Sequence, residues 1–203
     1  MRIGIYGGTF NPIHRGHTAL AKSLVRQGLV DEVWLMVSPQ NPLKDNDAAS
    51  YADRFAMAQI ATKYIKGVIA SDFENHLPIP SYTITTLNSL KKTYPQHTFS
   101  LVIGADNWQR FSQWYKADEI LAQFPILIFQ RPGTPLPTPN SQRPPTNDQR
   151  LTTTIQTVNT PLYDISSTEI RRRVLANEPL TNLVNKKVKH YIYSHSLYNH
   201  KKE

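Results

Sequence analysis

The stretch RIGIYGGTFNPIHRGHTAL, residues 2–20, leads from a short apolar segment through two glycines into a region with helical spacing. The apolar segment, residues 2–8, predicts a buried strand that ends in glycines. From His14 to Gly28 the apolar residues recur on one helical face with basic residues opposite, and Gly28 ends the pattern. The chain is therefore expected to begin with a strand that is followed directly by a helix.

The same alternation continues along the chain. Apolar runs that predict further strands lie at 32–38, 67–71, 98–104 and 124–130, with strand-like residues again within 152–167. Segments that predict helices lie at 50–67, where Ser50 and Asp53 are spaced as a capping box, and at 81–94, 117–123 and 167–177. Because strands that alternate with helices form parallel sheets, we expect an α/β fold: a Rossmann-like, doubly wound parallel sheet with helices on both faces.

The length of 203 residues suits one α/β domain with a sizeable core, so we expect a single domain over residues 1–203. Within it, residues 131–150 hold six prolines and, apart from Leu136, no large apolar residue, which predicts an exposed loop. Residues 181–203 combine lysines with apolar and aromatic residues, which predicts a small, basic, helical C-terminal part.

The net charge of +8 and the pI of about 9.7 predict a surface that attracts anions. The absence of cysteine excludes disulfides and thiolate metal sites. The first residues, MRIGIYGG, have too few apolar side chains for a secretory signal, and no apolar run has the length needed to span a bilayer. We therefore expect a soluble cytoplasmic protein with no membrane partner.

Residues 7–20 have the features of an anion site. Gly7 and Gly8 lack side chains, so a ligand can approach the backbone where the first strand ends. The next helix starts near His14 and points its free N–H groups at the same place, and Gly16 leaves room beside His14 and His17. This pattern favours a polyphosphate ligand. A metal site at the two histidines and plain helix capping are the alternatives.

A second anion site is predicted by ISSTEIRRR, residues 165–173. Ser166, Ser167 or Thr168 can cap a helix whose first N–H groups face an anion, and Arg171, one turn further on, can hold a phosphate with two hydrogen bonds. For Arg172 and Arg173 we expect an ordinary basic face in contact with solvent.

GGTFNPIHRGH and ISSTEIR resemble the two signatures of the nucleotidyltransferase superfamily, Gly-Gly-Thr-Phe-Asp/Asn-Pro-x-His-x-Gly-His and Ile-Ser-Ser-Thr-x-Ile-Arg. The resemblance implies that His14, His17 and Arg171 are catalytic. The residues that it implies for ATP binding are Gly7, Gly8, Thr9, Phe10, His14, His17, Gly104, Asp106, Ile165, Ser167, Thr168 and Arg171.

Two middle segments, PSYTITTL (80–87) and IGADNWQRFSQWYKADEIL (103–121), are similar to segments of bacterial nicotinate-nucleotide adenylyltransferases. A helix start at Ser81 or Thr83 offers N–H groups to a carboxylate, and an aromatic ring can stack on a pyridinium. The resemblance implies that nicotinate mononucleotide binds at Lys44, Tyr82, Thr83, Thr85, Trp114 and Tyr115. The family has Asp where Thr85 stands, and the segment around Lys44 is shorter here and lacks the family's histidine, whereas Phe111 and Trp34 are expected in the core.

The family resemblance implies that nicotinate mononucleotide and ATP give deamido-NAD and pyrophosphate, with Mg²⁺ bound to ATP. The phosphate of the mononucleotide attacks the α-phosphorus in line, without a covalent intermediate. Because this phosphate is mostly dianionic at pH 7, no general base is required. Bound phosphates are expected to raise the pKa of both histidines. Lys44 would screen the incoming phosphate.

Two alternatives remain open at this point. One is an enzyme that uses nicotinamide mononucleotide, or both mononucleotides. The other is a basic RNA-binding module, suggested by NKKVKHYIYSHSLYNHKK, residues 185–202, although a C-terminal helix packed on a sheet has the same pattern. We expect small-molecule substrates and no nucleic-acid partner.

Overall fold

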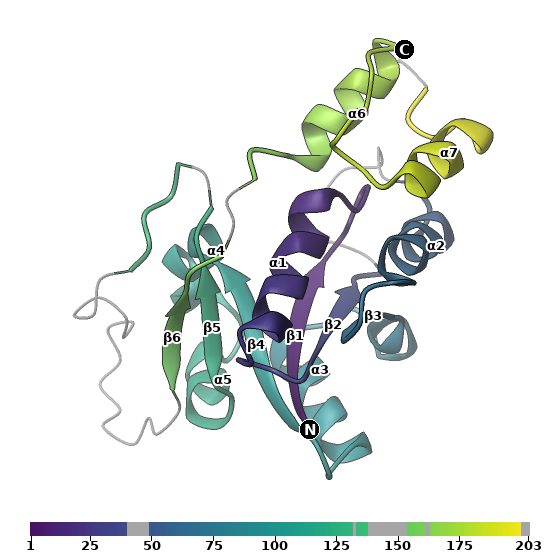
Figure 1. The fold of residues 1–203 in the computed structure, drawn as a ribbon. Coiled ribbons are helices and arrows are strands. Elements are labelled where there is room, and N and C mark those ends of the chain that lie inside the picture. Colours follow the sequence, from purple (N-terminus) through teal and green to yellow (C-terminus); the bar gives the residue numbers. More distant parts are fainter. Residues whose placement is uncertain (40–48, 132, 138–153, 161–162, 200–203) are drawn as a thin grey trace.

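The computed structural model describes residues 1–39, 49–131, 133–137, 154–160 and 163–199. Six strands form one sheet in the order β3-β2-β1-β4-β5-β6, and every neighbouring pair is parallel (Figure 1). The strands are β1 (Arg2–Gly8), β2 (Glu32–Val37), β3 (Val68–Ser71), β4 (Thr98–Gly104), β5 (Ile126–Phe129) and β6 (Ile155–Val158). The predicted doubly wound parallel sheet is confirmed.

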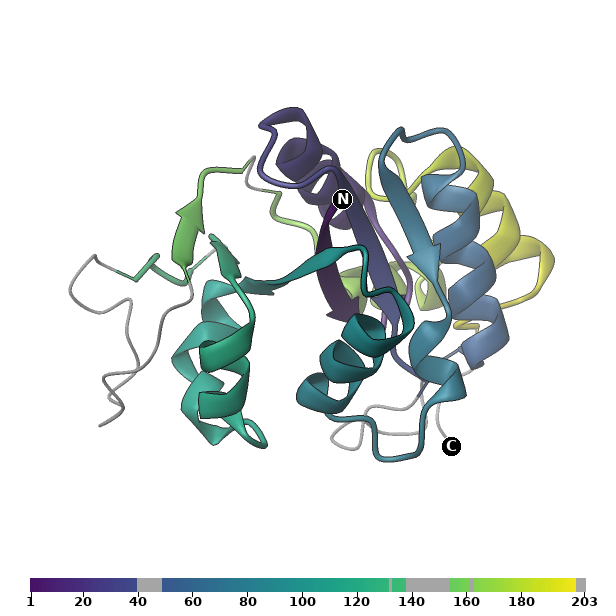
Figure 2. The ribbon, with the colours of Figure 1, turned by 90° about the horizontal axis from the view of Figure 1, so that it is seen from below.

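Helices cover both faces of the sheet, as Figures 1 and 2 show from two directions. On one face the buried side chains come from α1 (Arg15–Arg26), α2 (Tyr51–Thr62), α6 (Ser167–Leu175) and α7 (Lys186–Ser194). On the other they come from α3 (Thr83–Thr93), α4 (Ala105–Gln109), α5 (Ala117–Gln123) and the 3-10 turn η2 (Phe111–Gln113), while η1 (Phe73–His76) follows β3. The central strand β1 supplies Tyr6 to the first cluster and Ile3 and Ile5 to the second, as the alternation of strand side chains requires.

Helix α2 begins as the sequence predicts, because the Ser50 hydroxyl accepts a hydrogen bond from the Asp53 N–H at 3.1 Å. The predicted length, 50–67, is too long. The helix ends at Thr62, and the chain then turns into β3 through Gly67, whose φ of +74° is the left-handed conformation that glycine adopts without strain. Helix α4 and both 3-10 turns were not predicted from the sequence.

The predicted basic C-terminal part is helical only over α7, within the described residues. Val188 and Ile192 of α7 are buried in the cluster beside α2, so the interpretation as a packed amphipathic helix is confirmed. Most of the proline-rich stretch, 132 and 138–150, lies outside the described residues. Within the described part, none of the helices combines the length and apolar character needed to cross a bilayer.

The two central strands separate toward their carboxyl ends. Strand β1 pairs with β2 as far as Gly8 but with β4 only as far as Ile5. The connections that follow β1 and β4 lead to opposite faces of the sheet, so this is the topological switch point of a doubly wound fold. Ligands of such sheets bind at this point, beyond the carboxyl ends of the strands.

Candidate functional site

The loop that follows β1 is held in an unusual backbone conformation. Phe10 has a φ of +47°, and the bond between Asn11 and Pro12 is cis. A left-handed φ is costly for a bulky residue and persists only where surrounding contacts fix it. The Phe10 ring lies against Gly8, where an added Cβ would be 3.1 Å from the ring. At Gly7 an added Cβ would meet nothing within 4 Å, so the open backbone of this turn is at Gly7.

The two predicted histidines lie together at the start of α1. The ring centroids of His14 and His17 are 3.6 Å apart, with 22° between the planes. The His14 backbone N–H donates to Nδ1 of His17 at 3.2 Å, so the proton of a neutral His17 ring lies on Nε2, which is left as a donor. The role predicted for Gly16, an open approach for the ligand, is wrong. An added Cβ at Gly16 would lie 3.1 Å from the His14 ring, so Gly16 makes room for that imidazole.

Both imidazoles are neutral in the folded protein. His14 is 6% exposed, and burial, followed by the charge of Arg131, lowers its pKa to about 3. Burial, His14 and Arg131 hold the pKa of His17 well below its ordinary value. The protein thus shifts these pKa values downward, opposite to the upward shift expected from bound phosphate. Nδ1 of His14 is buried and has no hydrogen-bond partner in the described structure.

Arg131 is a site residue that sequence reasoning missed. It follows β5, and its Nε is buried, lies 3.6 Å from Oδ1 of Asp106 and has no hydrogen-bond partner among the described residues. The carboxylate of Asp106 and the Arg131 side chain fill the space where a Cβ of Gly104 would lie, so a larger residue at position 104 would displace the Asp106 carboxylate. The place of Arg131 in the sequence, just beyond a strand end and at the start of the proline-rich stretch, does not by itself distinguish it from a loop residue.

The second predicted signature is fastened to the first. Ser166 caps α6 by accepting from the Glu169 N–H at 3.1 Å. The Ser167 hydroxyl donates to the Pro12 carbonyl at 2.9 Å, across 155 positions of sequence. Arg171 donates to the Asn11 carbonyl at 2.8 Å, and its other terminal nitrogen lies 3.3 Å from the Thr168 hydroxyl.

The other predicted residues around α6 differ in their surroundings. Thr168 is exposed, and Ile165 packs against the core. Arg172 and Arg173 form ion pairs with Glu169 and Glu178 at the surface, with nitrogen–oxygen distances of 2.7 to 2.8 Å for the three shortest contacts. The basic face predicted for these two arginines is therefore a surface ion-pair network.

Two of the residues predicted for the acceptor, Tyr82 and Thr83, lie at the start of α3, and Tyr115 lies beside Tyr82. Tyr82 is the N-cap residue and Thr83 the first helical residue. The exposed rings of Tyr82 and Tyr115 lie 4.5 Å apart. Trp114 is half-buried against Phe111, which is fully buried as predicted. Trp34 likewise packs on the core, Thr85 is half-buried within α3, and Lys44 lies outside the described residues.

A buried carboxyl group that was missed lies beside this helix start. Glu74, in η1, is 8% exposed and accepts from the Thr86 hydroxyl at 2.9 Å. Burial raises its pKa, while hydrogen bonds from Thr86, Ser38 and Ser81 oppose that shift. Glu74 thus ties the end of β2 to the start of α3. No sequence pattern marks this residue, because nothing distinguishes one acidic residue in a loop from its neighbours.

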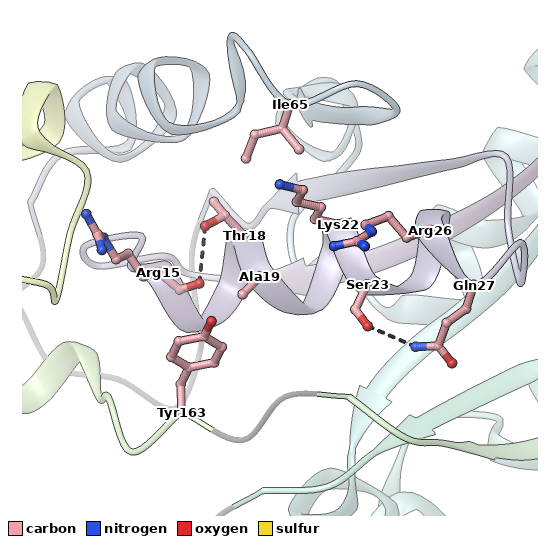
Figure 3. A pocket seen from close by; sticks show the side chains of 9 residues that line it. All are labelled: Arg15, Thr18, Ala19, Lys22, Ser23, Arg26, Gln27, Ile65 and Tyr163. Carbon is pink, nitrogen blue, oxygen red and sulfur yellow. Dashed lines mark hydrogen bonds between the residues drawn. The ribbon is translucent and has the colours of Figure 1, made fainter.

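A groove of about 620 Å³ runs along the outer face of α1 (Figure 3). None of the predicted site residues lines it, although a neighbouring groove of about 420 Å³ reaches His14. Helix α1 contains no acidic residue, so the groove is cationic. Its lining residues are Arg15, Thr18, Ala19, Lys22, Ser23, Arg26, Gln27, Ile65 and Tyr163.

The hydrogen-bond donors at the carboxyl ends of β1 and β4 carry either a positive charge or no charge. Histidines, arginines and backbone N–H groups predominate, and the carboxylate of Asp106 is paired with Arg131. Among the described residues no cluster of three or more His, Asp or Glu could hold a metal ion. Such a site suits an anion.

Comparison with known proteins agrees with this geometry. The family model described as cytidylyltransferase-like matches residues 5–173. A protein of Bacteroides thetaiotaomicron, named as a probable nicotinate-nucleotide adenylyltransferase, is 42% identical over 193 residues, which cover 95% of this chain and 91% of that protein. The nicotinate-nucleotide adenylyltransferase of Bacillus subtilis is 32% identical over 200 residues, which cover 97% and 98% respectively.

Solved structures show the same fold. The nicotinic acid mononucleotide adenylyltransferase of Plasmodium falciparum, determined in complex with NaAD, superposes with a TM-score of 0.81 at 19% identity, over 100% of this chain and 99% of that one. The same enzyme in complex with APC superposes with a TM-score of 0.80.

Proposed function

The chain belongs to the nicotinate-nucleotide adenylyltransferase family, within the cytidylyltransferase-like proteins, and from this premise we propose how its site works. The reaction joins nicotinate mononucleotide to the adenylyl group of ATP, gives deamido-NAD and pyrophosphate, and is a step of NAD biosynthesis. The observation that carries the proposal is the joining of the two signatures, because Ser167 and Arg171 are hydrogen-bonded to the loop that leads to His14 and His17.

The chemistry that this site must perform is mainly electrostatic. The phosphate of nicotinate mononucleotide is mostly dianionic at pH 7 and attacks the α-phosphorus of ATP, the bond to the β-phosphate oxygen breaks, and pyrophosphate leaves. Two polyanions have to be brought together, and the charge that develops has to be spread. Neutral and cationic donors suit that task better than carboxylates.

Each group has a distinct role in this proposal. His17 donates from Nε2 to the α- and β-phosphates, and His14 joins it once bound phosphate favours its protonation. The open backbone at Gly7 receives the triphosphate, and Arg171 with the N–H groups of α6 holds the β- and γ-phosphates. Arg131 supplies a further positive charge near both histidines.

ATP enters as its magnesium complex, with Mg²⁺ held largely by phosphate oxygens and water. The acceptor binds at the other side of the switch point, where the start of α3 offers N–H groups to the nicotinate carboxylate and Tyr82, Tyr115 and Trp114 offer rings to the pyridinium. We place the reaction in the cytoplasm, with small molecules as the substrates and no nucleic-acid partner.

The test is pyrophosphate release from ATP and Mg²⁺ by the purified protein, with nicotinate mononucleotide in one series and nicotinamide mononucleotide in the other. We expect a strong preference for the acid. Equal rates would leave the reaction in place and remove the carboxylate site from the proposal. No release with either mononucleotide would overturn the proposal as a whole.

A further inference from the structure

The loop between β1 and α1 is also held by residues that lie outside the two signatures. Asn11 is 8% exposed, and its Oδ1 accepts two hydrogen bonds, from the Tyr198 hydroxyl at 2.8 Å and from the Ala49 N–H at 3.1 Å. Its carbonyl accepts from Arg171 at 2.8 Å. Asn11 is therefore fixed through both its side chain and its backbone.

Arg54 of α2 holds the same loop from a second direction. It is 4% exposed, and its guanidinium donates to backbone carbonyls of Thr9 at 2.8 Å, Ser38 at 2.7 Å, Pro39 at 3.0 Å and Ala49 at 3.1 Å. These bonds join the β1 loop to the end of β2 and to the start of α2. A lysine could not make them, because only the planar fork of a guanidinium presents donors in this arrangement.

Tyr198 reaches Asn11 because α7 is anchored on α2. Val188 and Ile192 bury the apolar face of α7, and the Tyr191 hydroxyl donates to Oδ1 of Asp53 in α2 at 3.0 Å. Beyond the helix the chain folds back, with Tyr198 at a φ of +63°. A left-handed conformation is costly for tyrosine, so the hydrogen bond and the packing of its ring must fix it. Burial raises the pKa of the Tyr198 phenol, so the hydroxyl stays a donor over a wider range of alkaline pH than an exposed tyrosine would.

We propose that Tyr198 and Arg54 are positioning residues of the adenylyl-transfer site, which fix residues 9–14 through the Asn11 side chain and the Thr9 carbonyl. This inference rests on the proposed function. Between these two anchors lies Phe10 with its left-handed φ, and after them the chain reaches His14. If the hydrogen bonds of either residue are lost, the loop can relax. His14, His17 and the Asn11 carbonyl, which orients Arg171, then move with the loop.

The variant Tyr198→Phe tests the hydroxyl alone, because the ring and its packing are kept. The matched control is Tyr193→Phe on α7, whose exposed tyrosine has no described hydrogen bond from its hydroxyl. Asn11 keeps its bond from the Ala49 N–H in the Tyr198 variant, so we expect kcat/KM for ATP to fall by about tenfold, the lower part of the range for a buried acceptor that loses a donor. KM for nicotinate mononucleotide should change by less than about twofold.

A double-mutant cycle separates positioning from general stabilisation. In an Asn11→Ala background the Tyr198→Phe change should alter kcat/KM for ATP by less than about twofold, because the acceptor of its hydrogen bond is gone. An equal tenfold loss in both backgrounds would overturn the proposal. So would a lowered melting temperature with unchanged kinetic constants, since that result would make Tyr198 a purely structural residue.

Amide hydrogen exchange gives a readout that does not depend on activity. Residues 9–14 should exchange faster in Tyr198→Phe than in the wild-type protein and in Tyr193→Phe. Unchanged exchange together with unchanged kinetics would overturn the proposal. If the wild-type protein transfers no adenylyl group while the exchange difference remains, the proposed function is wrong and the fixing of this loop by Tyr198 stands.

Discussion

The imidazole of His17 stacks on the imidazole of His14, and the His14 backbone N–H donates to the stacked ring at 3.2 Å. The pair is neutral because burial and the nearby Arg131 disfavour protonation. Two rings in van der Waals contact cannot both gain a proton without strong repulsion. A phosphate that protonates one of them therefore raises the cost of protonating the other.

Stability should depend on pH through this pair. Below pH 6.5 the unfolded chain binds a proton at each imidazole, whereas folded His14 does not until the pH approaches its pKa of about 3. The stabilising contribution is thus present above pH 6.5 and is lost as the pH falls. We expect His14 to lower the free energy of unfolding by about 1.4 kcal/mol per pH unit between pH 6 and pH 5, and the lowered pKa of His17 to add a contribution of the same sign.

Urea unfolding at several pH values measures this slope. The variant His14→Gln should have a shallower slope than the wild type by about 1.4 kcal/mol per pH unit. The control variant is His190→Gln, at an exposed position of α7 outside the site. An unchanged slope in His14→Gln would contradict the neutral state assigned to this residue.

His17→Ala should lower kcat by about 100-fold or more, because a donor to the reacting phosphates is lost where charge develops. KM for nicotinate mononucleotide should change far less. Steady-state kinetics of pyrophosphate release measure both constants, and His190→Ala serves as the control. A His17→Ala enzyme that turns over at nearly the wild-type rate would remove this residue from the mechanism.

Arg131→Gln tests the residue that the sequence did not reveal. Loss of its charge should lower kcat by about tenfold or more. It should also raise the pKa of both histidines, although both pKa values stay below the ordinary value because burial is the larger cause of the downward shift. NMR titration of the imidazoles and steady-state kinetics measure the two effects. Arg110→Gln, at an exposed position, is the control. Histidine pKa values that do not rise would contradict the electrostatic role of Arg131.

Glu74→Gln should weaken acceptor binding and leave ATP binding unaffected. The amide keeps one acceptor oxygen but replaces the other with a donor, so the bonds from Thr86, Ser81 and Ser38 cannot all persist. We expect KM for nicotinate mononucleotide to rise by about fivefold with KM for ATP unchanged. Asp72→Asn, close by and exposed, is the control. Equal effects on both substrates would show that Glu74 does not act on the acceptor side alone.

Removal of Lys201 to Glu203 should leave adenylyl transfer intact. RNA affinity, measured by fluorescence anisotropy over a salt series, should be weak and unaffected by the truncation. Tight RNA binding that depends steeply on salt and disappears on truncation would restore the RNA-binding alternative. The variant Lys22→Ala with Arg26→Ala measures how much of any weak affinity comes from the groove on α1.

The sequence predicted the strands, the parallel character of the sheet and most helices, because apolar periodicity follows directly from burial on a sheet. The family resemblance, which implies ATP contacts for both signatures, predicted that residues 7–17 and 165–171 lie near one another. The sequence did not predict Arg54 or Tyr198. Their hydrogen bonds to this loop span 45 and 187 positions, and neither residue has a local pattern that distinguishes it from other arginines and tyrosines in the sequence.

Two predictions about single elements, the end of α2 and the role of Gly16, differ from the structure. The predicted helix 50–67 was too long because its apolar periodicity continues through Ile65, while Gly67 supplies the turn that ends the connection. Gly16 was assigned to the ligand, although its lack of a side chain serves the neighbouring His14 ring. In both cases the glycine indicated a position where a side chain is disfavoured, but only tertiary packing decided which neighbouring residue or turn required it.

The single sheet divides the hydrophobic core into two clusters, and the proposed site follows the same division. The β1 loop and α6, which hold the proposed triphosphate contacts, pack into one cluster, while α3, Trp114 and the start of α5 belong to the other. Substitutions in the core cluster that supports the acceptor side can therefore accumulate without disturbing the cluster that supports the triphosphate side. An evolving lineage could exchange one mononucleotide for another, or lose the carboxylate that Thr85 replaces, while the machinery for adenylyl transfer is inherited unchanged.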